Sequence, residues 1–478
     1  MPRRTKIVAT LGPATDPPEV MEAIIRAGVD VVRLNFSHGE AADHRRRVKQ
    51  LRALAAKVGK DVGVLGDLQG PKIRIEKFRT GRITLKDGAQ FTLDAELPDN
   101  AGTGETVGLS YKTLPADVKA GDVLVLGDGE ISLRVESVQG SRIVCRVVNG
   151  GELSDHKGIN RQGGGLSAEA LTNKDLRDVK FAAELEVDYL AVSFPRDAAD
   201  IERARSLLRA AGSKAGIVAK IERAEAIHNL DEIITASDAV MIARGDLAVE
   251  IGDAELPGIQ KLIVQRAREL SRVVITATQM MESMIHSPVP TRAEVLDVAN
   301  AVMDGTDAAM LSAETAAGKY PVKTVEAMAR VCEGAERQRL SLRSPRRQEQ
   351  HFERVDETIA MAVMYTANHM DVKAIIALTE SGSTTLWMSR ISSGIPIYAM
   401  TRHEATRRRV TLYRGVYPIA FDVMHKNADH VLLSAVQELR KRELVKNGDY
   451  VVCTKGELSG VTGGTNSLKI LRVGDSAD

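Results

Sequence analysis

The chain has 478 residues, 44% of them hydrophobic and 27% charged, which is the composition of a folded protein with sizeable cores and more than one domain. The 65 Lys and Arg residues almost balance the 64 Asp and Glu residues, so the net charge of +1 gives no reason to expect nucleic acid or a membrane surface as a partner. The three cysteines are far apart and no segment reaches the roughly 18 apolar residues of a membrane span, so we expect a cytoplasmic protein without a disulfide framework.

Eight short apolar segments precede residue 316, and each ends on polar or charged residues. They cover 5–12, 30–39, 61–70, 189–194, 216–222, 239–246, 273–279 and 308–314. Near-continuous apolar runs are typical of strands buried on both faces, and helical stretches such as 197–211 and 257–271 between them indicate a parallel sheet. Eight such units predict a closed (β/α)8 TIM barrel, in which functional groups gather where the strands end.

The alternation is interrupted from residue 71 to about residue 167 by short alternating strands separated by Gly, Asp and Asn turns. The expected strands are GRITLKDG, AQFTLDA, DVLVLGDG, ISLRVESV and SRIVCRVVN. We interpret this region as a small β-barrel domain inserted after the third barrel strand, with hinges near Gly70-Pro71 and the glycine run 163–165. Long insertions at a functional rim are commonly lids, so we expect it to close over the barrel mouth. A passive structural insertion is the alternative.

A polar, Arg-rich stretch from Arg337 to Arg354 indicates a partly helical connection with a solvated face. Beyond it, a helix at about 355–370 precedes five strands, with helices between the first four. The strands are expected at 372–379, 395–401, 416–421, 449–456 and 467–473. This order predicts a doubly wound α/β domain. The expected division is a barrel at 1–70 and 168–340, a lid domain at 71–167 and a C-terminal regulatory domain at 341–478.

Two carboxylates at neighbouring strand ends predict a divalent-metal site. Glu222 and Asp246 can converge on Mg²⁺, which typically takes one or two protein carboxylates and leaves its other positions to water and substrate oxygens. Lys220 lies two positions before Glu222, so both side chains point to the same face of the strand. A cation beside an ammonium suits a phosphoryl group or an enolate. The alternative is a buried Lys-Glu ion pair that fills a layer of the barrel.

A second group of strand-end residues suits a phosphate and a monovalent cation. Arg33, Asn35 and Ser37 alternate along one segment and therefore share one face, and Asp67 joins them from the next strand. Gly245 begins a helix-like stretch, where the lack of a side chain lets backbone N–H groups approach an anion closely.

Five motifs of the sequence resemble pyruvate kinase. They are VVRLNFSHG (31–39), AKIER (219–223), MIARGDLAVEI (241–251), TATQMMESM (276–284) and PTRAEVLDVANAVMDGTDAAMLSAETAAGKYP (290–321). The similarity runs in order over essentially the whole chain, which resembles the bacterial-type members. It implies an enzyme that transfers the phosphoryl group of phosphoenolpyruvate to ADP, giving pyruvate and ATP as the last step of glycolysis, in an allosterically regulated homotetramer.

The resemblance also implies a role for each matching residue. Glu222 and Asp246 would hold Mg²⁺, with Mn²⁺ as an alternative ion, and a second Mg²⁺ would arrive with ADP. Arg33 and Lys220 would bind the phosphoryl group in flight, with Lys220 also stabilising the enolate, and Thr278 would lie beside the carbon that is protonated. The backbone N–H groups of Gly245 and Asp246 would bind the substrate carboxylate. The nucleotide would be bound by Arg74, Asn35 and His38.

The sequence departs from the family at the monovalent-cation pocket. In K⁺-dependent members, side chains corresponding to Asn35, Ser37 and Asp67 coordinate K⁺, with Thr and Glu where this chain has Leu68 and Lys72. We expect the ammonium of Lys72, close to Asp67, to replace K⁺, which would then not be required. A further departure is 127–129, which reads GDG where the family commonly has DDG.

The turn TESGST (379–384) offers a phosphate cradle for an allosteric effector. Its donors are Thr379, Ser381, Gly382, Ser383 and Thr384. Members that respond to fructose 1,6-bisphosphate tend to carry Lys where Glu380 stands and a longer basic and aromatic loop where this chain has VTGGTNS (461–467). We therefore expect a sugar monophosphate or a nucleotide monophosphate.

Two other functional classes remain open at this point. Aldolases and lyases that cleave 2-oxo acids also combine a barrel, Mg²⁺ and a pyruvate enolate, but they need no second nucleotide phosphate site. A non-catalytic metabolite sensor is disfavoured because every candidate catalytic position is present. Coupling of pyruvate formation to ATP formation would separate these classes.

Overall fold

The computed structural model describes residues 2–127, 129–338, 352–422, 430–456 and 463–475. Most of the Arg-rich connection, Asp128 of the lid loop and the first two residues of the 461–467 loop therefore lie outside the described residues. No helix of the described part is both long and apolar enough to cross a membrane.

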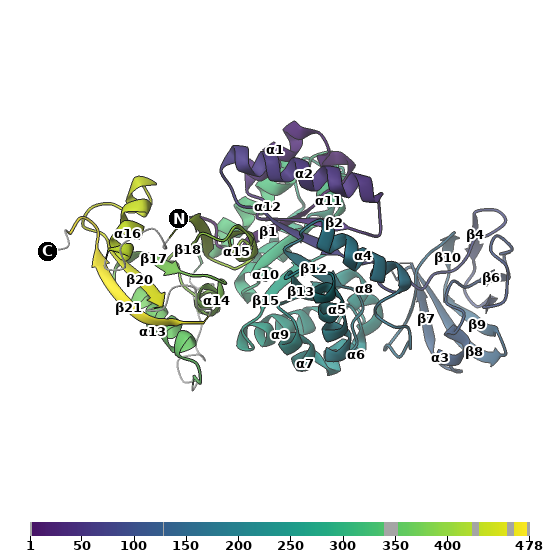
Figure 1. The fold of residues 1–478 in the computed structure, drawn as a ribbon. Helices are drawn as coiled ribbons and strands as arrows, with labels where there is room; N and C mark the ends of the chain where they lie inside the picture. The colour runs from purple at the N-terminus through teal and green to yellow at the C-terminus, as the bar shows by residue number, and fades with distance from the viewer. Residues whose placement is uncertain (1, 128, 339–351, 423–429, 457–462, 476–478) are drawn as a thin grey trace.

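Eight parallel strands form the centre of the molecule and close into a barrel, which confirms the predicted TIM-barrel fold (Figure 1). They are β1 (Lys6–Thr10), β2 (Val31–Asn35), β3 (Gly63–Asp67), β12 (Tyr189–Val192), β13 (Gly216–Ile221), β14 (Ala239–Ala243), β15 (Val273–Ala277) and β16 (Ala308–Leu311). Their hydrogen-bonded order is β1-β16-β15-β14-β13-β12-β3-β2. Side chains alternate along each strand, so Ile7 and Ala9 pack toward the helices while Val8 belongs to a separate inner core.

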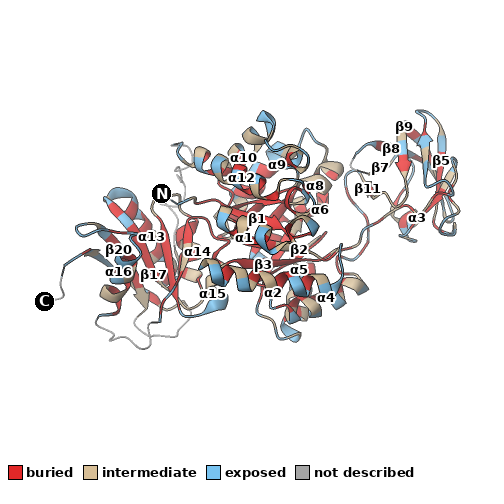
Figure 2. Cartoon of the chain, turned by 90° about the horizontal axis from the view of Figure 1, so that it is seen from above, coloured by how far each residue is buried: buried red, intermediate tan, exposed pale blue. Residues whose placement is uncertain are grey.

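Helices surround the barrel and turn their exposed faces outward (Figure 2). They are α1 (Pro18–Ala27), α2 (Ala41–Val58), α4 (Asn173–Glu184), α5 (Ala198–Ala210), α6 (Ala224–His228), α7 (Leu230–Ala236), α8 (Arg244–Ile251), α9 (Leu256–Glu269), α10 (Arg292–Asp304), α11 (Ala313–Ala316) and α12 (Pro321–Glu336). Short 3-10 turns lie at Pro13–Thr15 and Glu282–Ile285. The start of α10 is fixed by a capping box, in which the Thr291 hydroxyl accepts from the Glu294 N–H and the Glu294 carboxylate accepts from the Thr291 N–H.

The inserted domain lies at one end of the molecule and is joined to the barrel by two chain crossings (Figures 1 and 2). Its elements are β4 (Arg82–Leu85), β5 (Gln90–Asp94), β6 (Thr106–Gly108), α3 (Leu114–Asp117), β7 (Val123–Leu126), β8 (Ile131–Gln139), β9 (Arg142–Asn149), β10 (Gly151–Ser154) and β11 (Ile159–Arg161). The expected small β barrel takes the form of a six-stranded sheet, β11-β7-β8-β9-β5-β6, and a two-stranded sheet, β10-β4. Both sheets enclose one core, to which Leu85, Phe91, Leu133 and Leu153 contribute.

The C-terminal domain lies at the opposite end of the barrel and has the predicted doubly wound topology (Figure 1). Its elements are α13 (Val355–His369), β17 (Val372–Leu378), α14 (Ser383–Ser389), β18 (Ile397–Thr401), α15 (Glu404–Val410), β19 (Val416–Ala420), α16 (Val431–Lys441), β20 (Tyr450–Gly456) and β21 (Thr465–Arg472). The strand order is β19-β18-β17-β20-β21, with β21 antiparallel to β20. The inner core of the barrel continues into this domain, because Val8 and Met388 belong to the same apolar cluster.

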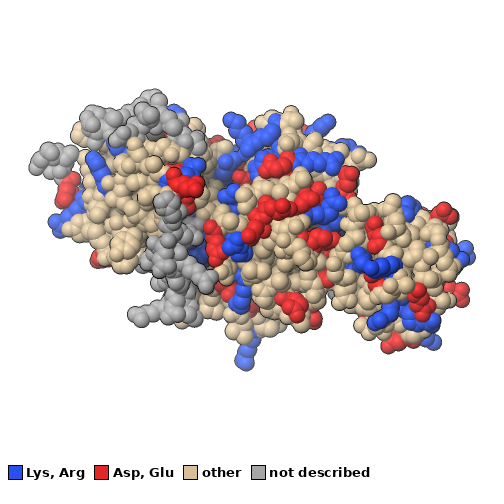
Figure 3. Space-filling view, turned by 90° about the horizontal axis from the view of Figure 1, so that it is seen from below, with Lys and Arg blue, Asp and Glu red and all other residues tan. Residues whose placement is uncertain are grey.

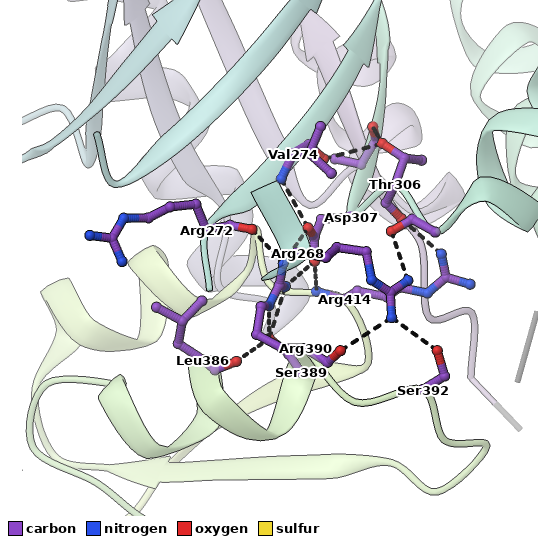
Figure 4. A network of polar contacts seen from close by, with 12 residues as sticks. Arg268, Arg272, Val274, Thr306, Asp307, Leu386, Ser389, Arg390, Ser392 and Arg414 are labelled. Atoms are coloured by element: carbon purple, nitrogen blue, oxygen red, sulfur yellow. Dashed lines mark hydrogen bonds and ion pairs between the residues drawn. The ribbon is translucent and has the colours of Figure 1, made fainter. Parts of the chain in front are cut away.

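A buried ion pair joins the C-terminal domain to the barrel (Figure 4). Arg390, directly after α14, is 1% exposed, and its Nη1 lies 2.8 Å from Oδ2 of Asp307, directly before β16. Asp307 also accepts the N–H groups of Val274 at 2.9 Å and Arg414 at 3.2 Å. Arg390 in turn donates to the carbonyl of Arg272 at 2.6 Å. The C-terminal end of α14 is therefore tied to the start of β15 and β16.

Charge on the surface is mixed in sign. On the face drawn in Figure 3, Lys and Arg side chains alternate with Asp and Glu side chains over both the barrel and the inserted domain. This distribution agrees with the balanced composition and offers no extended field of one sign on that face.

Candidate active site

The strand-end residues of three barrel strands meet in one buried cluster of alternating charge. Nζ of Lys220 in β13 lies 2.9 Å from Oε1 of Glu222 and 3.5 Å from Oδ1 of Asp67 at the end of β3. Nη2 of Arg33 in β2 lies 2.6 Å from the other oxygen of Asp67. These side chains are 1% to 12% exposed, so each charge depends on its neighbours rather than on water. The predicted convergence of Arg33, Asp67, Lys220 and Glu222 is present.

Ser193 completes this cluster and was missed by the sequence reasoning. It follows β12, and its hydroxyl accepts from Nζ of Lys220 at 2.7 Å and donates to the carbonyl of Leu68 at 2.8 Å. The apolar run 189–194 was recognised as a strand, so the same strand-end rule could have identified the serine that closes it.

The protonation of the cluster follows from burial and from these ion pairs. Burial alone would lower the pKa of the Lys220 ammonium, but Asp67 and Glu222 raise it above its ordinary value. Burial would likewise raise the pKa of Asp67, but Lys220 and Arg33 hold it below its ordinary value. Lys220 is therefore an ammonium and Asp67 a carboxylate at neutral pH.

Glu222 behaves differently because it faces a second carboxylate. Burial and, to a smaller extent, Asp246 raise its pKa to about 7, against the opposing effect of Lys220. Oε2 of Glu222 is held by the N–H of Phe194 at 2.8 Å, whereas Oε1 has no hydrogen bond of good geometry beyond its ion pair with Lys220. Two facing carboxylates, one with a free buried lone pair, fit a hard divalent cation such as Mg²⁺. Among the described residues no group of three or more His, Cys, Asp or Glu side chains could hold a metal, so other ligands would come from substrate and water.

Thr278 follows β15, and Gly245 and Asp246 follow β14 in the first turn of α8. The Thr278 hydroxyl accepts from the N–H of Gly245 at 2.9 Å and donates to the carbonyl of Ala277 at 2.6 Å. This N–H was expected to contact a substrate carboxylate, and here its partner is Thr278. Thr278 has φ +66° and Gln279 has φ +53°, left-handed conformations that cost about 1–3 kcal/mol each for a residue other than glycine.

The hinge between barrel and inserted domain forms one wall of a cavity of about 220 Å³ beside Asp246. Its lining includes Lys72, Arg74, Lys157, Asp246 and Glu250. Lys72 is exposed at the mouth of this cavity, and its strongest carboxylate neighbour is Asp246, not Asp67 as expected. Partial burial, Arg74 and Lys220 lower the pKa of Lys72, while Asp246 opposes this.

The remaining residues of the expected cation and nucleotide pockets are arranged as follows. Oδ1 of Asn35 accepts from the N–H of Ser37 at 3.1 Å, and its Nδ2 lies 3.2 Å from Nδ1 of His38. Leu68 is 1% exposed within the core between barrel and helices, so its side chain does not line a polar pocket. Arg74 donates to the carbonyl of His156 in the inserted domain at 2.9 Å. These contacts hold Asn35 and Arg74 at the rim rather than inside the buried cluster.

The hydrogen-bonding groups of the turn 379–384 are partly satisfied by contacts within the C-terminal domain. The Thr379 hydroxyl accepts from the Gly382 N–H at 2.9 Å, and the buried Thr384 hydroxyl lies 2.7 Å from that of Thr465. The Ser381 and Ser383 hydroxyls lie 3.3 Å apart. Glu380 pairs with His403 and lies 3.7 Å from Nη2 of Arg402.

A barrel mouth that combines a buried ammonium, a guanidinium and facing carboxylates defines a class of enzyme that handles phosphoryl groups with a divalent cation. The family description "Pyruvate kinase, barrel domain" matches residues 2–325, and "Pyruvate kinase, alpha/beta domain" matches residues 357–471. The chain belongs to the pyruvate kinase family and is a phosphotransferase.

Similar proteins cover nearly the whole chain. Pyruvate kinase II of Salmonella typhimurium is 57% identical over 98% of this chain and 99% of its own length. The pyruvate kinase of Haemophilus influenzae is 55% identical over 95% of this chain and 96% of its own. A crystal structure of a pyruvate kinase from Cryptosporidium parvum has a TM-score of 0.91 at 32% identity and covers 98% of this chain and 96% of that chain. The family membership excludes the carbon–carbon lyase alternative.

Proposed function

We propose that this chain catalyses Mg²⁺-dependent transfer of the phosphoryl group of phosphoenolpyruvate to ADP, as the last step of glycolysis and under allosteric control. The observation that carries the proposal is the pair Glu222 and Asp246 beside the Lys220 ammonium, because two carboxylates that suit a hard divalent cation stand next to a fixed positive charge. Mg²⁺ held by this pair would neutralise charge on the phosphoryl, carboxylate and enolate oxygens.

The chain's own residues would act by position and charge. In the transfer, the bond between phosphorus and the enol oxygen breaks while a β-phosphate oxygen of ADP forms the new bond. Lys220 and Arg33 supply fixed positive charge to the phosphoryl group in flight, and Lys220 stabilises the enolate left behind. The enolate carbon then takes a proton from the Thr278 hydroxyl or from a water beside it, which gives pyruvate. The N–H of Asp246 orients the substrate carboxylate, while the N–H of Gly245 holds the Thr278 hydroxyl. Arg74, Asn35 and His38 bind the nucleotide.

The position of Lys72 bears on whether the enzyme needs a monovalent cation. Asn35, Ser37 and Asp67 offer oxygens for K⁺, but Lys72 already places a positive charge in the same mouth, facing Asp246 and Glu222. The pKa of His38 is lowered by burial and by Lys72, Arg33 and Arg74, which supports a shared positive wall. We infer that Lys72 substitutes for the charge of K⁺ without occupying its coordination site, so K⁺ is not required.

Two further proposals concern the outer domains. Residues 71–167 form a lid over the cavity that Lys72 and Asp246 line, and 341–478 form a regulatory domain within a homotetramer. The effector turn would take a single phosphate of a sugar or nucleotide monophosphate on the hydroxyls of Thr379, Ser381 and Ser383, because the carboxylate of Glu380 stands beside it. The cytoplasmic location stays a prediction.

A coupled assay tests the proposed reaction directly. Phosphoenolpyruvate, ADP and Mg²⁺ are supplied, and pyruvate is measured through the oxidation of NADH by lactate dehydrogenase. We expect pyruvate and ATP in equal amounts, with no pyruvate above background when ADP or Mg²⁺ is omitted. Pyruvate formation that does not depend on ADP would contradict the proposal.

A further inference from the structure

The guanidinium of Arg244, the first residue of α8, holds the backbone that carries Thr278. Its Nε donates to the carbonyl of Ala277 at 3.0 Å, and its Nη2 donates to the carbonyl of Thr278 at 2.6 Å. The same Nη2 lies 2.9 Å from the sulfur of Met280. One planar group therefore binds the carbonyl before the Cα of Thr278 and the carbonyl after it.

The other side of Arg244 is fixed by two helices. Nη1 lies 2.7 Å from Oδ1 of Asp297 in α10 and 3.4 Å from Oε1 of Gln260 in α9. The Arg244 side chain is 11% exposed, and these contacts use all five of its N–H donors. Because Asp297 supplies the charge-assisted bond, it sets the plane of the guanidinium relative to β15.

The Thr278 segment needs such support. Thr278 and Gln279 both have positive φ, and a β-branched residue adopts this conformation only where its surroundings determine it. The residue after Arg244 contributes as well, since the Gly245 N–H donates to the Thr278 hydroxyl at 2.9 Å. Arg244 thus orients the carbonyl of Thr278, and Gly245 orients its hydroxyl. Asp246 follows directly in the same turn.

We propose that Arg244, braced by Asp297, is a positioning residue that places the Thr278 hydroxyl for protonation of the enolate carbon; this inference rests on the proposed function. In that step the electron pair of the carbon–carbon double bond forms a new C–H bond, and the enolate oxygen becomes the carbonyl of pyruvate. The proton comes from the Thr278 hydroxyl or from a water held by it, and solvent replaces it. Arg244 itself does not touch the reacting atoms.

A double-mutant cycle tests whether Arg244 acts through Thr278. The variants are Arg244→Lys, Thr278→Ala and their combination, each assayed with phosphoenolpyruvate, ADP and Mg²⁺. A lysine keeps the charge but loses the planar fork, so we expect kcat to fall about 10²-fold, with the KM for phosphoenolpyruvate changed less than about threefold. In the Thr278→Ala background, the same substitution should change kcat by less than about threefold. Losses that multiply in the double variant would overturn the proposal.

The protonation step can also be followed without phosphoryl transfer from phosphoenolpyruvate. Run backward, it exchanges the methyl hydrogens of pyruvate with D₂O, which proton NMR detects in the presence of Mg²⁺ and ATP. We expect Arg244→Lys to slow this exchange about as much as it slows kcat. Unchanged exchange alongside a reduced kcat would also overturn the positioning role.

Arg205→Lys is the matched control for a purely structural effect. Arg205 likewise binds a carboxylate and a backbone carbonyl: it lies 2.8 Å from Asp238 and donates to the carbonyl of Ala236 at 2.5 Å. Both partners precede β14, so these contacts lie at the other end of the barrel from Thr278. Arg205→Lys should leave kcat and exchange within about twofold of wild type.

If Arg244→Lys does not fold, as judged by thermal unfolding, Asp297→Asn replaces it in the same cycle with an expected loss of about tenfold. A wild type that makes no pyruvate would instead refute the proposed function, whereas an active wild type with a multiplicative cycle refutes this inference alone.

Discussion

Nζ of Lys220 lies 2.9 Å from Oε1 of Glu222, and Asp246 on the neighbouring strand end raises the pKa of the same carboxyl group. One carboxylate thus lies between a fixed ammonium and a second negative charge. The two carboxylates suit a hard divalent cation, and the ammonium stands where negative charge would develop during phosphoryl transfer.

Lys220→Met should lower turnover at least about 10²-fold, because it removes an ammonium aimed at developing charge. It also leaves Glu222 without its cation and Asp67 with Arg33 alone, so thermal unfolding must be measured beside the coupled assay. Lys174→Met is the control, since it removes an ion-paired lysine of α4, 2.7 Å from the carbonyl of Phe36. A folded Lys220→Met enzyme with more than about a tenth of wild-type activity would contradict the assigned role. Glu222→Gln and Asp246→Asn should first raise the Mg²⁺ concentration that is needed.

The wild type should be nearly fully active in K⁺-free buffer balanced with a bulky ammonium salt, because Lys72 already supplies positive charge beside Asp246. Lys72→Glu should create a K⁺ requirement. Lys157→Glu reverses the charge of a lysine that lines the same cavity from the inserted domain, and it should not create a K⁺ requirement. A wild-type rate that rises more than about tenfold with K⁺, about 1.4 kcal/mol of barrier, would show that Lys72 does not stand in for the ion.

A phosphate monoester should activate the enzyme better than fructose 1,6-bisphosphate. The turn 379–384 has donors for one phosphate, while Glu380 places a carboxylate beside it, engaged by His403 and Arg402. Ser381→Ala should weaken activation by the monoester without changing the rate in its absence. Titrations of ribose 5-phosphate, AMP and the bisphosphate compare them, and tight activation by the bisphosphate would reject this view of the turn.

The sequence predicted the fold and the buried cluster because both depend on local regularities. Strand periodicity placed the eight barrel strands, and the rule that strand ends meet brought Lys220, Glu222 and Asp67 together. Strands β6, β10 and β11 were missed, since each contains a single apolar side chain and therefore shows no alternation. The ion pair of Arg390 and Asp307 joins residues 83 positions apart in different domains, and no periodic pattern encodes such a pairing. The neighbour of Lys72 was misjudged because a hinge residue takes its direction from the path of the inserted domain.

Arg390→Met should destabilise the protein by about 3–5 kcal/mol, because it leaves Asp307 as an unpaired charge at a buried domain junction. Arg390→Met combined with Asp307→Val should recover part of this loss, since both charges are then absent. Arg266→Met is the contrasting control, because its pair with Asp231 is 32% and 59% exposed and is worth at most about 1 kcal/mol. Unfolding midpoints of the four proteins decide the matter, and equal losses for Arg390→Met and Arg266→Met would contradict the burial argument.

Glu250→Gln should stabilise the protein increasingly as pH rises. Burial raises the pKa of Glu250 from 4.5 to about 7, so between these values the unfolded chain ionises while the folded protein keeps its proton. The contribution of Glu250 to stability therefore falls as pH rises through this window and above pH 7 costs roughly 3 kcal/mol, at about 1.4 kcal/mol per pKa unit. Glutamine can still accept the Ala224 N–H, which Glu250 accepts at 2.8 Å, but it cannot ionise.

Glu294→Gln is the control with the opposite sign. Although burial acts to raise it, the pKa of Glu294 is held below 4.5 by hydrogen bonds from Ser283 and Thr291, so its stabilising contribution is present above that pH and disappears as pH falls through its folded pKa. At pH 8 we expect a raised unfolding midpoint for Glu250→Gln and a lowered one for Glu294→Gln, and near pH 4.5 the first difference should vanish. A Glu250→Gln effect that is independent of pH between 4.5 and 8 would show that Glu250 is ionised in the folded protein throughout, and that its buried environment compensates the charge.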